Sequence, residues 1–255
     1  MTSWLSPDWP APPNIGAAIT TRQVGCSSIP FDSNNLALHV GDSDSAVQAN
    51  RKSLADSLGL AQQPLWLDQI HGTQVVYAPA ANSVPSADAS YSDQPGQASV
   101  VMTADCLPLL FCDRQGTQVA AAHAGWRGLC NGIVRNTVAR FRRPDQVLAY
   151  LGPAIGPEAF EVGAEVLQAF ILGVPQSANR AQQIEAIQAA FMPTEQDKYL
   201  ADLCALARAE LISCGVGAIY GGDYCTYTDA ARFYSYRREA KTGRMASLVW
   251  LKNNS

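Results

Sequence analysis

The sequence has little charge, and it contains no long hydrophobic run. Charged residues make up 16% of the 255 residues, and the formal net charge is −4. A small negative charge gives no broad attraction to nucleic acid or anionic lipid, so a bound anion must meet a local cluster of Arg and Lys. No run of about 18 apolar residues occurs, which argues against a membrane-spanning helix. Residues 1–8 lack a basic region followed by an apolar core, so we expect a cytoplasmic protein without a signal peptide.

Cysteine and histidine are also sparse. The seven cysteines are irregularly spaced and odd in number, which argues against a disulfide framework and favours reduced thiols. Only three histidines occur, at positions 39, 71 and 123, so any histidine-dependent chemistry draws on a very short list. His39 has no distinctive neighbours, and we expect it to be a local hydrogen-bonding residue. His71 lies in a polar bend, residues 68–73, where functional side chains tend to lie.

Strand-like and helical stretches alternate without a regular βαβ repeat. Strands are expected at 15–20, 74–78, 99–102, 107–112, 118–123, 146–151 and 247–251. Helices are expected at 43–60, 127–142, 162–172 and 199–214, and the polar segment 173–194 looks peripheral. Hydrophobic residues make up 47% of the chain, which suits a sizeable core. The pattern predicts an α+β fold in one domain, residues 1–255, with helices covering a mixed sheet system.

A β-hairpin is predicted around the turn signal at residues 113–116, which begins with Asp and ends with Gly. If the two central residues form the loop, residue 112 pairs with 117. This register places Cys106 directly opposite His123 on the same face, with Cβ atoms roughly 5 Å apart. A bulged turn with Gly116 in the left-handed conformation would shift the pairing by one residue and separate the two side chains.

The paired thiol and imidazole point to a metal site or to a nucleophile with its base. Asp105 precedes Cys106 and could orient a ligand or serve as an acid or base. Arg127 lies at a predicted helix start, where free N–H groups suit an anion such as phosphate. A lone buried cysteine is most often a small core residue, and these spacings match no short-range zinc pattern. From the residues alone, both kinds of site stay open.

Several motifs resemble those of the YfiH-like family, which has been labelled polyphenol oxidase or laccase domain, purine nucleoside phosphorylase, and peptidoglycan editing factor. They run in order through nearly the whole chain: Thr-Thr-Arg at 20–22, Asn-Leu-Ala-Leu-His-Val-Gly-Asp at 35–42, Asp-Gln-Ile-His-Gly at 68–72, Ala-Asp-Cys-Leu-Pro at 104–108, His-Ala-Gly-Trp-Arg-Gly at 123–128, Gly-Pro-Ala-Ile-Gly-Pro at 152–157, Phe-Tyr-Ser-Tyr-Arg-Arg at 233–238 and Thr-Gly-Arg-Met-Ala-Ser at 242–247.

The resemblance implies a layered α/β/β/α sandwich with mixed sheets, related to a cysteine-hydrolase-like toxin domain. It implies zinc held by His71, Cys106 and His123. It also implies phosphorolysis of adenosine, inosine and methylthioadenosine, with adenosine deamination as a further activity. One departure is the loop at 23–28, which is shorter and less Gly-rich than the family's usual pattern.

Two histidines and one thiolate leave a fourth position open for water or substrate, as in catalytic zinc sites. Candidate phosphate-binding residues, by charge, are Arg22, Arg127, Arg238 and Arg244. Asp105 or a tyrosine could protonate the leaving base. The expected partners are purine nucleosides and phosphate, without nucleic acid or membrane, and we expect a monomer or a weak homo-oligomer.

Three alternatives compete with this interpretation. Cys106 activated by His123 could act as an amidase-type hydrolase that edits peptidoglycan precursors. A copper-dependent polyphenol oxidase is less favoured, because three histidines cannot supply a multicopper centre, although a single His₂Cys copper site is possible. A zinc ion could also be a structural clip in a non-catalytic protein.

Overall fold

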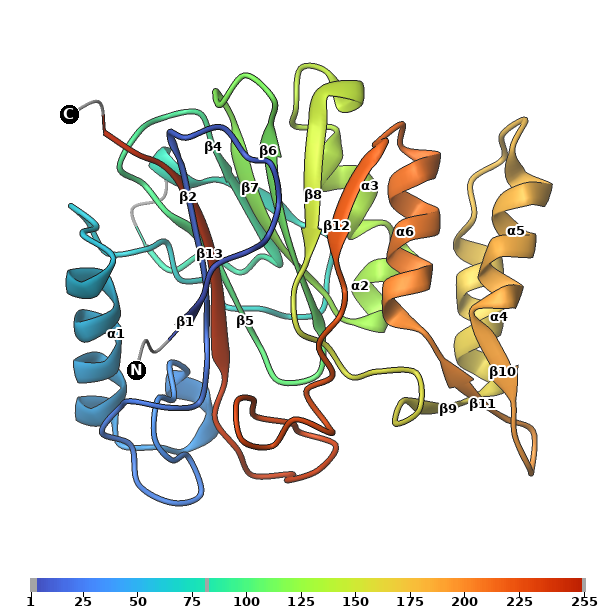
Figure 1. Ribbon diagram of the computed structural model, residues 1–255. Helices are drawn as coiled ribbons and strands as arrows, with labels where there is room; N and C mark the ends of the chain where they lie inside the picture. Colours follow the sequence, from blue (N-terminus) through green and yellow to red (C-terminus); the bar gives the residue numbers. More distant parts are fainter. Residues whose placement is uncertain (1–3, 81–82, 254–255) are drawn as a thin grey trace.

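Two β-sheets packed face to face form the centre of the molecule, and helices cover both outer faces (Figure 1). The structure is a computed structural model, and it describes residues 4–80 and 83–253. The predicted α+β class and the α/β/β/α layers are confirmed. The prediction of one domain over residues 1–255 stays a prediction. Among the described residues, no helix has both the length and the apolar composition needed to cross a bilayer.

The first sheet is antiparallel, and one helix covers its outer face. Its strands, in spatial order, are β1 (Trp4–Leu5), β2 (Ile15–Thr20), β13 (Met245–Leu251) and β5 (Ser99–Thr103). Helix α1 (Asp44–Ser57) buries Leu54 against this sheet beside Trp66 and Leu248. The other face packs on the second sheet. Because both faces are covered, β13 is buried along its whole length.

The second sheet is mixed and lies at the centre of the layers. Its strands, in spatial order, are β12 (Ala218–Gly221), β8 (Val147–Leu151), β6 (Leu107–Asp113), β7 (Val119–Ala124), β4 (Ala89–Ser92) and β3 (Val75–Tyr77). Alternate side chains of β6 pack into two different hydrophobic cores, one between the sheets and one beneath the helices. Leu110 packs between the sheets, whereas Leu109 and Phe111 face the helical layer. This alternation follows from the two-residue period of a strand.

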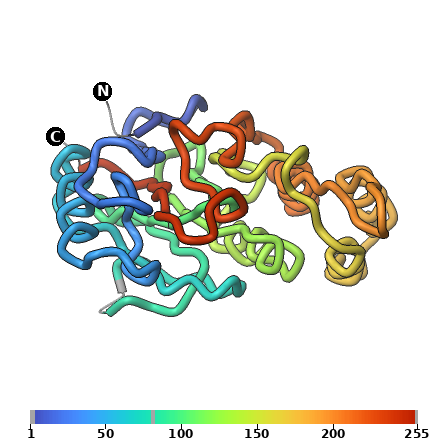
Figure 2. The backbone as a smooth tube through the Cα atoms, turned by 90° about the horizontal axis from the view of Figure 1, so that it is seen from below, coloured from blue at the N-terminus to red at the C-terminus, as the bar shows by residue number. Residues whose placement is uncertain are grey.

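The second helical layer extends away from the sheets on one side (Figures 1 and 2). It contains α2 (Trp126–Asn131), α3 (Ile133–Val138), α6 (Leu203–Ser213), α4 (Ala164–Gly173) and α5 (Arg180–Ala189). A small sheet lies at its end, with strand order β10 (Phe191–Pro193), β11 (Lys198–Ala201), β9 (Glu161–Gly163). Single 3-10 turns are η1 (Leu38–Val40), η2 (Ala78–Ala80) and η3 (Pro144–Gln146). Helix α5 lies within the segment that the sequence predicts to be peripheral.

The predicted hairpin exists, but its predicted register is wrong. His123 pairs with Pro108, not with Cys106, so the register differs by two residues. The turn is longer because the Asp113 carboxylate accepts hydrogen bonds from the backbone N–H groups of Thr117 and Gln118. Gly116 closes it with a φ of 68°. A shift of two keeps side-chain parity, so Cys106, just beyond the end of β6, still meets His123.

The predicted helix at 127–142 is interrupted. Gly132 has a φ of 100°, in the left-handed region, and separates α2 from α3. The apolar stripe of the prediction is retained, since Ile133, Val134 and Phe141 are buried in the core beside the second sheet. Helix α2 is consequently short. The helix dipole at its N-terminal N–H groups is therefore weaker than that of a four-turn helix.

Loops at one end of the sheets come together from distant parts of the chain, and they surround the site described below. Segments 20–43 and 224–244 lie side by side at this end, at the bottom of Figure 1 and facing the reader in Figure 2. Backbone hydrogen bonds join them: the N–H of Arg22 donates to the carbonyl of Arg232, and that of Leu36 to Arg244. The strand order of the first sheet therefore brings together two segments that lie far apart in the sequence.

We expect Gly132→Ala to destabilise the fold. A Cβ at this position would sit in strained backbone and 2.6 Å from the Arg135 guanidinium. The free energy of unfolding in urea should fall by about 1–3 kcal/mol. Gly217→Ala is the matched control, because no atom lies within 4 Å of the added Cβ. Equal effects of the two substitutions would show that the interruption at Gly132 is not required.

Candidate metal centre

Three side chains from separate segments meet at the loop end of the sheets. His71 comes from the bend before β3, Cys106 from the loop before β6, and His123 from β7. Their potential ligand atoms all lie within 4.8 Å of one another, and the Cys106 Sγ is 4.0 Å from the His71 Nε2. Among the described residues, no other group of three His, Cys, Asp or Glu side chains offers ligands so close together.

Asp88 joins the two histidines of this cluster. Its fully buried carboxylate accepts a hydrogen bond from the His123 Nδ1 at 2.8 Å. It also accepts the backbone N–H groups of His71 at 2.9 Å and Gly72 at 2.6 Å. Burial raises the pKa of Asp88, but the bonds from His123 and the backbone outweigh this and lower it. The ionised carboxylate thus fixes the His123 tautomer and leaves Nε2 for a ligand role.

Cys106 and His123 shift each other's pKa in opposite directions. Burial raises the pKa of the Cys106 thiol, but His123 and His71 outweigh this effect and lower it to about 6. Burial lowers the pKa of His123, but Cys106 and Asp88 outweigh it and raise it to about 9. Both shifts favour a thiolate beside an imidazolium in the metal-free protein. A thiolate is the form of cysteine that binds metal and attacks carbonyl carbon.

Gly125 leaves open the space in front of the cluster. A Cβ at this position would lie 3.0 Å from the Cys106 Sγ and 3.1 Å from the His71 Cδ2. In a tetrahedral zinc site, ligand atoms are roughly 3.3–3.6 Å apart, as follows from the usual Zn–N and Zn–S bond lengths. Small side-chain rotations would bring the three observed ligands to that spacing. The donor set, the open space and the carboxylate behind His123 all fit a metal ion.

Two strained residues shape the loops that carry the ligands. His71 has a φ of 59° and Asp105 a φ of 90°, both in the left-handed region. Asp105 is held on both carboxylate oxygens: it accepts the Thr226 hydroxyl at 2.7 Å and the backbone N–H of Arg237 at 2.6 Å. These bonds tie the loop of Cys106 to segment 224–244. Asp105 therefore positions Cys106, and each of its carboxylate oxygens already accepts one hydrogen bond.

A cavity of about 580 Å³ opens in front of the three ligands. This volume suits a ligand of nucleoside size. One part of the wall is apolar and aromatic, with Trp126, Ile155 and Phe160. Another part is basic. Three arginines line this part: Arg127, Arg237 and Arg244.

Two of the four predicted phosphate-binding arginines reach this cavity. The Arg127 guanidinium is exposed and lies 4.4 Å from the centre of the Trp126 ring. Arg244 is half-buried, and one of its nitrogens donates to the carbonyls of Thr242 and Gly243. Both guanidinium groups keep donors that no described residue engages, so both remain candidates for an anion.

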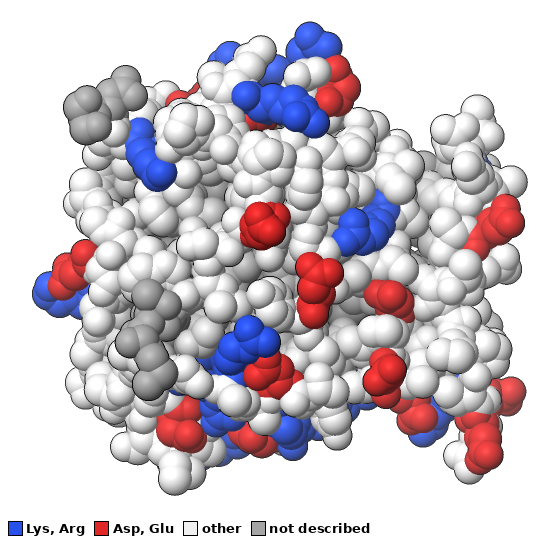
Figure 3. Space-filling model, viewed as in Figure 1, with Lys and Arg blue, Asp and Glu red and all other residues white. Residues whose placement is uncertain are grey.

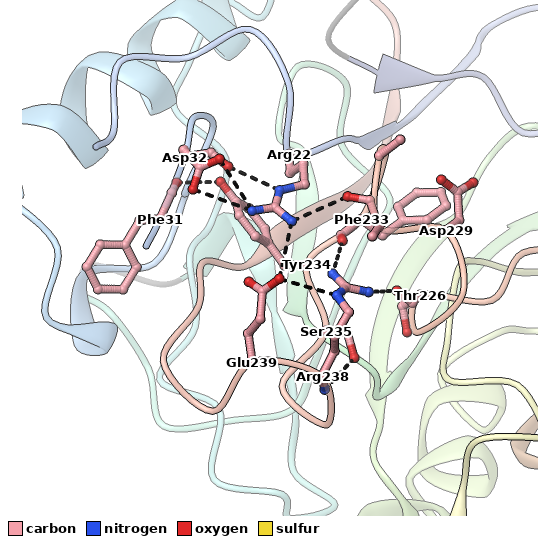
Figure 4. Close-up of polar contacts among 12 residues, drawn as sticks. Arg22, Phe31, Asp32, Thr226, Asp229, Phe233, Tyr234, Ser235, Arg238 and Glu239 are labelled. Carbon is pink, nitrogen blue, oxygen red and sulfur yellow. Dashed lines mark hydrogen bonds and ion pairs between the residues drawn. The ribbon is translucent and has the colours of Figure 1, made fainter. Parts of the chain in front are cut away.

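The structure does not bring Arg22 and Arg238 into the cavity. Figure 4 shows both in a network of polar contacts, and neither lines the cavity. Arg22 donates to the carbonyls of Asp32 and Ala230 and lies 3.8 Å from Glu239. Arg238 donates to the carbonyls of Thr226, Tyr227 and Phe233. Arg22 thus joins segment 20–43 to segment 224–244, and Arg238 braces segment 224–244 internally, which leaves both guanidinium groups few donors for phosphate.

Sequence reasoning missed three residues of this site. Asp88 had no visible signal, because its partners lie in the bend before β3 and on β7. Gln69 pairs with the backbone of Met102 through both its amide oxygen and its amide nitrogen, and so fixes the loop of His71. The expectation that His39 is a local hydrogen-bonding residue is wrong: its ring lines the cavity, and no described residue forms a hydrogen bond with it.

The charged side chains around this end are mixed. In Figure 3, Lys and Arg lie among Asp and Glu along the lower edge of the molecule, and large areas above carry neither. This agrees with the small net charge. No broad field of one sign appears on that face, so a bound anion would have to meet individual arginines such as those that line the cavity.

Comparison with known proteins assigns the chain to a family. The family described as multi-copper polyphenol oxidoreductase laccase matches residues 16–252. A Pseudomonas aeruginosa protein named purine nucleoside phosphorylase is 52% identical over 99% of this chain and all of that protein. Purine nucleoside phosphorylase YfiH of Escherichia coli strain K12 is 49% identical over 98% of this chain and all of its own length. This chain belongs to the YfiH-like family.

Solved structures of YfiH-like proteins share the fold. The crystal structure of a Neisseria meningitidis protein, NMB0706, has a TM-score of 0.92 and 49% identity, and covers 99% of this chain and all of its own. YlmD from Geobacillus stearothermophilus has a TM-score of 0.87 and 30% identity, over 99% of this chain and 97% of its own. The layers described above are thus those of the YfiH-like family.

We expect Asp88→Asn to weaken metal binding. Loss of the carboxylate removes the partner that orients His123, which typically costs about 10–100-fold in metal affinity. Titration against a chromogenic chelator measures this. Asp113→Asn is the control, because Asp113 is also buried and also accepts backbone N–H groups, but at the far end of the hairpin. Unchanged affinity in Asp88→Asn, or an equal loss in both variants, would contradict the role of Asp88.

Proposed function

We propose that this protein is a zinc-dependent purine nucleoside phosphorylase that acts on adenosine, inosine and methylthioadenosine. The observation that carries the proposal is one cavity that combines the His71, Cys106 and His123 cluster, exposed guanidinium groups and an aromatic wall. Relatives that carry the name purine nucleoside phosphorylase align over their whole length with this chain. Their agreement with the cavity's chemistry supports the proposal.

Each part of the cavity has a task in phosphorolysis. Phosphate must reach C1′ of the ribose while the purine leaves from the opposite side. Arg127 and Arg244 would hold the phosphate oxygens by charge-assisted hydrogen bonds. Trp126, Ile155 and Phe160 would exclude water from the reacting bond and contact the flat base. A zinc ion held by the three ligands would supply a fixed positive charge at this end of the cavity.

The metal in this proposal is zinc. Two histidines and one thiolate suit either zinc or a single copper ion. A multicopper centre needs further clusters of ligands, and the described residues contain no second one. The seven cysteines are free, which suits the reducing cytoplasm in which we place the protein. Whether it is a monomer or a weak homo-oligomer stays a prediction.

Adenosine deamination belongs to the proposal as a second activity at the same site. The family resemblance is its support, since the His-x-Glu and Pro-Cys-x-x-Cys signature of standard nucleoside deaminases is absent from the sequence. Release of ammonia from adenosine, without phosphate, would distinguish this activity from phosphorolysis.

One alternative keeps a specific observation in its favour. The thiolate of Cys106 beside protonated His123 is the arrangement that a cysteine hydrolase uses, and it would suit an amidase acting on peptidoglycan precursors. That chemistry needs a thiolate without a stoichiometric metal ion. Metal analysis of the active protein therefore separates the two functions.

Incubation with inosine should release hypoxanthine only when phosphate is present, with ribose 1-phosphate as the second product. The reason is that phosphate, and not water, is the nucleophile that the basic wall would hold. Base release followed by chromatography, on protein of known zinc content, measures this. The same rate in phosphate-free buffer would indicate a nucleoside hydrolase instead.

Arg127→Ala should raise the KM for phosphate more than the KM for the nucleoside. Its guanidinium has no carboxylate partner among the described residues and faces the cavity. The loss should weaken phosphate binding by about 1.5–3 kcal/mol, the range for a hydrogen bond to a charged group. Zinc content should not change, because Arg127 is not a ligand.

The control for this variant is Arg143→Ala, which removes the same charge from an exposed ion pair with Asp145 outside the cavity. Steady-state kinetics in which each substrate is varied separately give both KM values. An unchanged KM for phosphate in Arg127→Ala, or equal losses for both substrates, would remove Arg127 from the anion site. Arg127 would then serve to pack on Trp126.

A further inference from the structure

The imidazole of His39 is an unused titratable group on the wall of the cavity. It lies in η1 and lines the same space as the three metal ligands. It is exposed, and no described residue forms a hydrogen bond with its ring. A purine base would present ring nitrogens and exocyclic groups to this wall, and these groups accept or donate hydrogen bonds.

The backbone around His39 is held firmly, although its ring is free. Asn35 is fully buried, and its side chain bonds the N–H and the carbonyl of Ala37 and the carboxylate of Asp42. The Asn35 amide oxygen also accepts the N–H of Arg244 at 3.0 Å. One buried side chain thus fixes η1 to the segment that forms the basic wall. This is the support that a reacting side chain needs.

Phosphorolysis requires a proton donor for the leaving purine, and most candidates in the cavity are already engaged. His71, Cys106 and His123 form the metal cluster. Both carboxylate oxygens of Asp105 accept hydrogen bonds from neighbouring residues. The arginines stay protonated in proteins and do not transfer protons. Among the described residues that line the cavity, His39 and Tyr236 remain, and an imidazolium is a far stronger acid than a phenol.

We propose that His39 is a catalytic residue of this site and protonates N7 of the purine base as the base leaves. This inference rests on the proposed phosphorylase function. A neutral base is a much better leaving group than an anionic one, and such acid catalysis typically contributes 10²–10⁴-fold to the rate. In this scheme the arginines hold the attacking phosphate, and the imidazole of His39 protonates the leaving purine.

The step balances in atoms and charge. An oxygen of HPO₄²⁻ forms a bond to C1′ while the bond from C1′ to N9 breaks, and the electron pair of that bond moves into the purine. The imidazolium of His39 gives its proton to N7, so the base departs neutral. The new ribose 1-phosphate still carries the proton of the attacking phosphate. That proton passes through water to His39 and restores the imidazolium.

Charged groups from three segments surround His39. Burial lowers the pKa of His39; Arg244 lowers it further, Asp68 raises it, and Arg51 of α1 lowers it. The imidazolium is therefore a stronger acid than a histidine at its ordinary pKa, which favours transfer to a weakly basic ring nitrogen. A bound phosphate dianion would oppose the two arginines and increase the protonated fraction.

A substrate that needs no proton provides the test. In 7-methylinosine the base is already cationic, so it leaves without an acid. We expect His39→Gln to lower kcat/KM for inosine by about 100-fold or more, and that for 7-methylinosine by no more than about threefold, because only inosine needs general acid catalysis. His39→Ala, which leaves room for the N7 methyl group, should show the same selectivity. Zinc content should equal that of the wild type in both variants.

Tyr236→Phe is the matched variant, because it removes the other free proton donor of the cavity. It should change kcat/KM for both nucleosides by the same factor. Equal loss on both nucleosides in the His39 variants, including complete loss, would overturn the proposal, as would full activity on inosine. A selective loss in Tyr236→Phe would assign the role to Tyr236. A wild type that phosphorolyses neither nucleoside would refute the phosphorylase function itself, and the role of His39 with it.

Discussion

The site depends on one buried carboxylate, that of Asp88. It lies at the start of the region where β3, β4 and β7 run side by side, and it bonds both segments that carry the histidines. Its own backbone carbonyl accepts the N–H of His123 at 2.7 Å, so side chain and main chain hold the same partner. A charge without access to water is costly unless it is fully hydrogen-bonded, and here each bond also places a ligand. Stability and ligand geometry are thus coupled at Asp88.

The layered fold supplies the rest of the site by bringing the ends of the strands together. Strand β13 lies between β2 and β5, so the loop before β13 meets the loop after β2. Arg22 bonds a backbone carbonyl across this junction, Arg238 bonds a carbonyl within segment 224–244, and Asp105 ties that segment to the loop of Cys106. The walls of the cavity are therefore built by polar side chains whose partners are mainly backbone groups. Such walls can hold exposed arginines and a free imidazole at fixed places.

Much of this could be predicted from the sequence. The buried strands, the hairpin and the layers followed from hydrophobic patterning and motif resemblance, and the three candidate ligands do meet. The hairpin register could not be predicted, because the side chain of Asp113 lengthens the turn by bonding Thr117 and Gln118. Arg22 and Arg238 were chosen for charge alone, and charge does not reveal which carbonyls a guanidinium will meet. Asp88 and His39 owe their roles to contacts between distant segments, which a local pattern does not contain.

The central claim is that His71, Cys106 and His123 bind one zinc ion with a position left open. X-ray absorption at the zinc edge of the purified protein tests it most directly. The account predicts one sulfur at about 2.3 Å and two imidazole nitrogens at about 2.0–2.1 Å, together with one lighter ligand from solvent. Cys106→Ala should remove the sulfur contribution. A shell of nitrogen and oxygen alone, or catalytically active protein without bound zinc, would contradict the account.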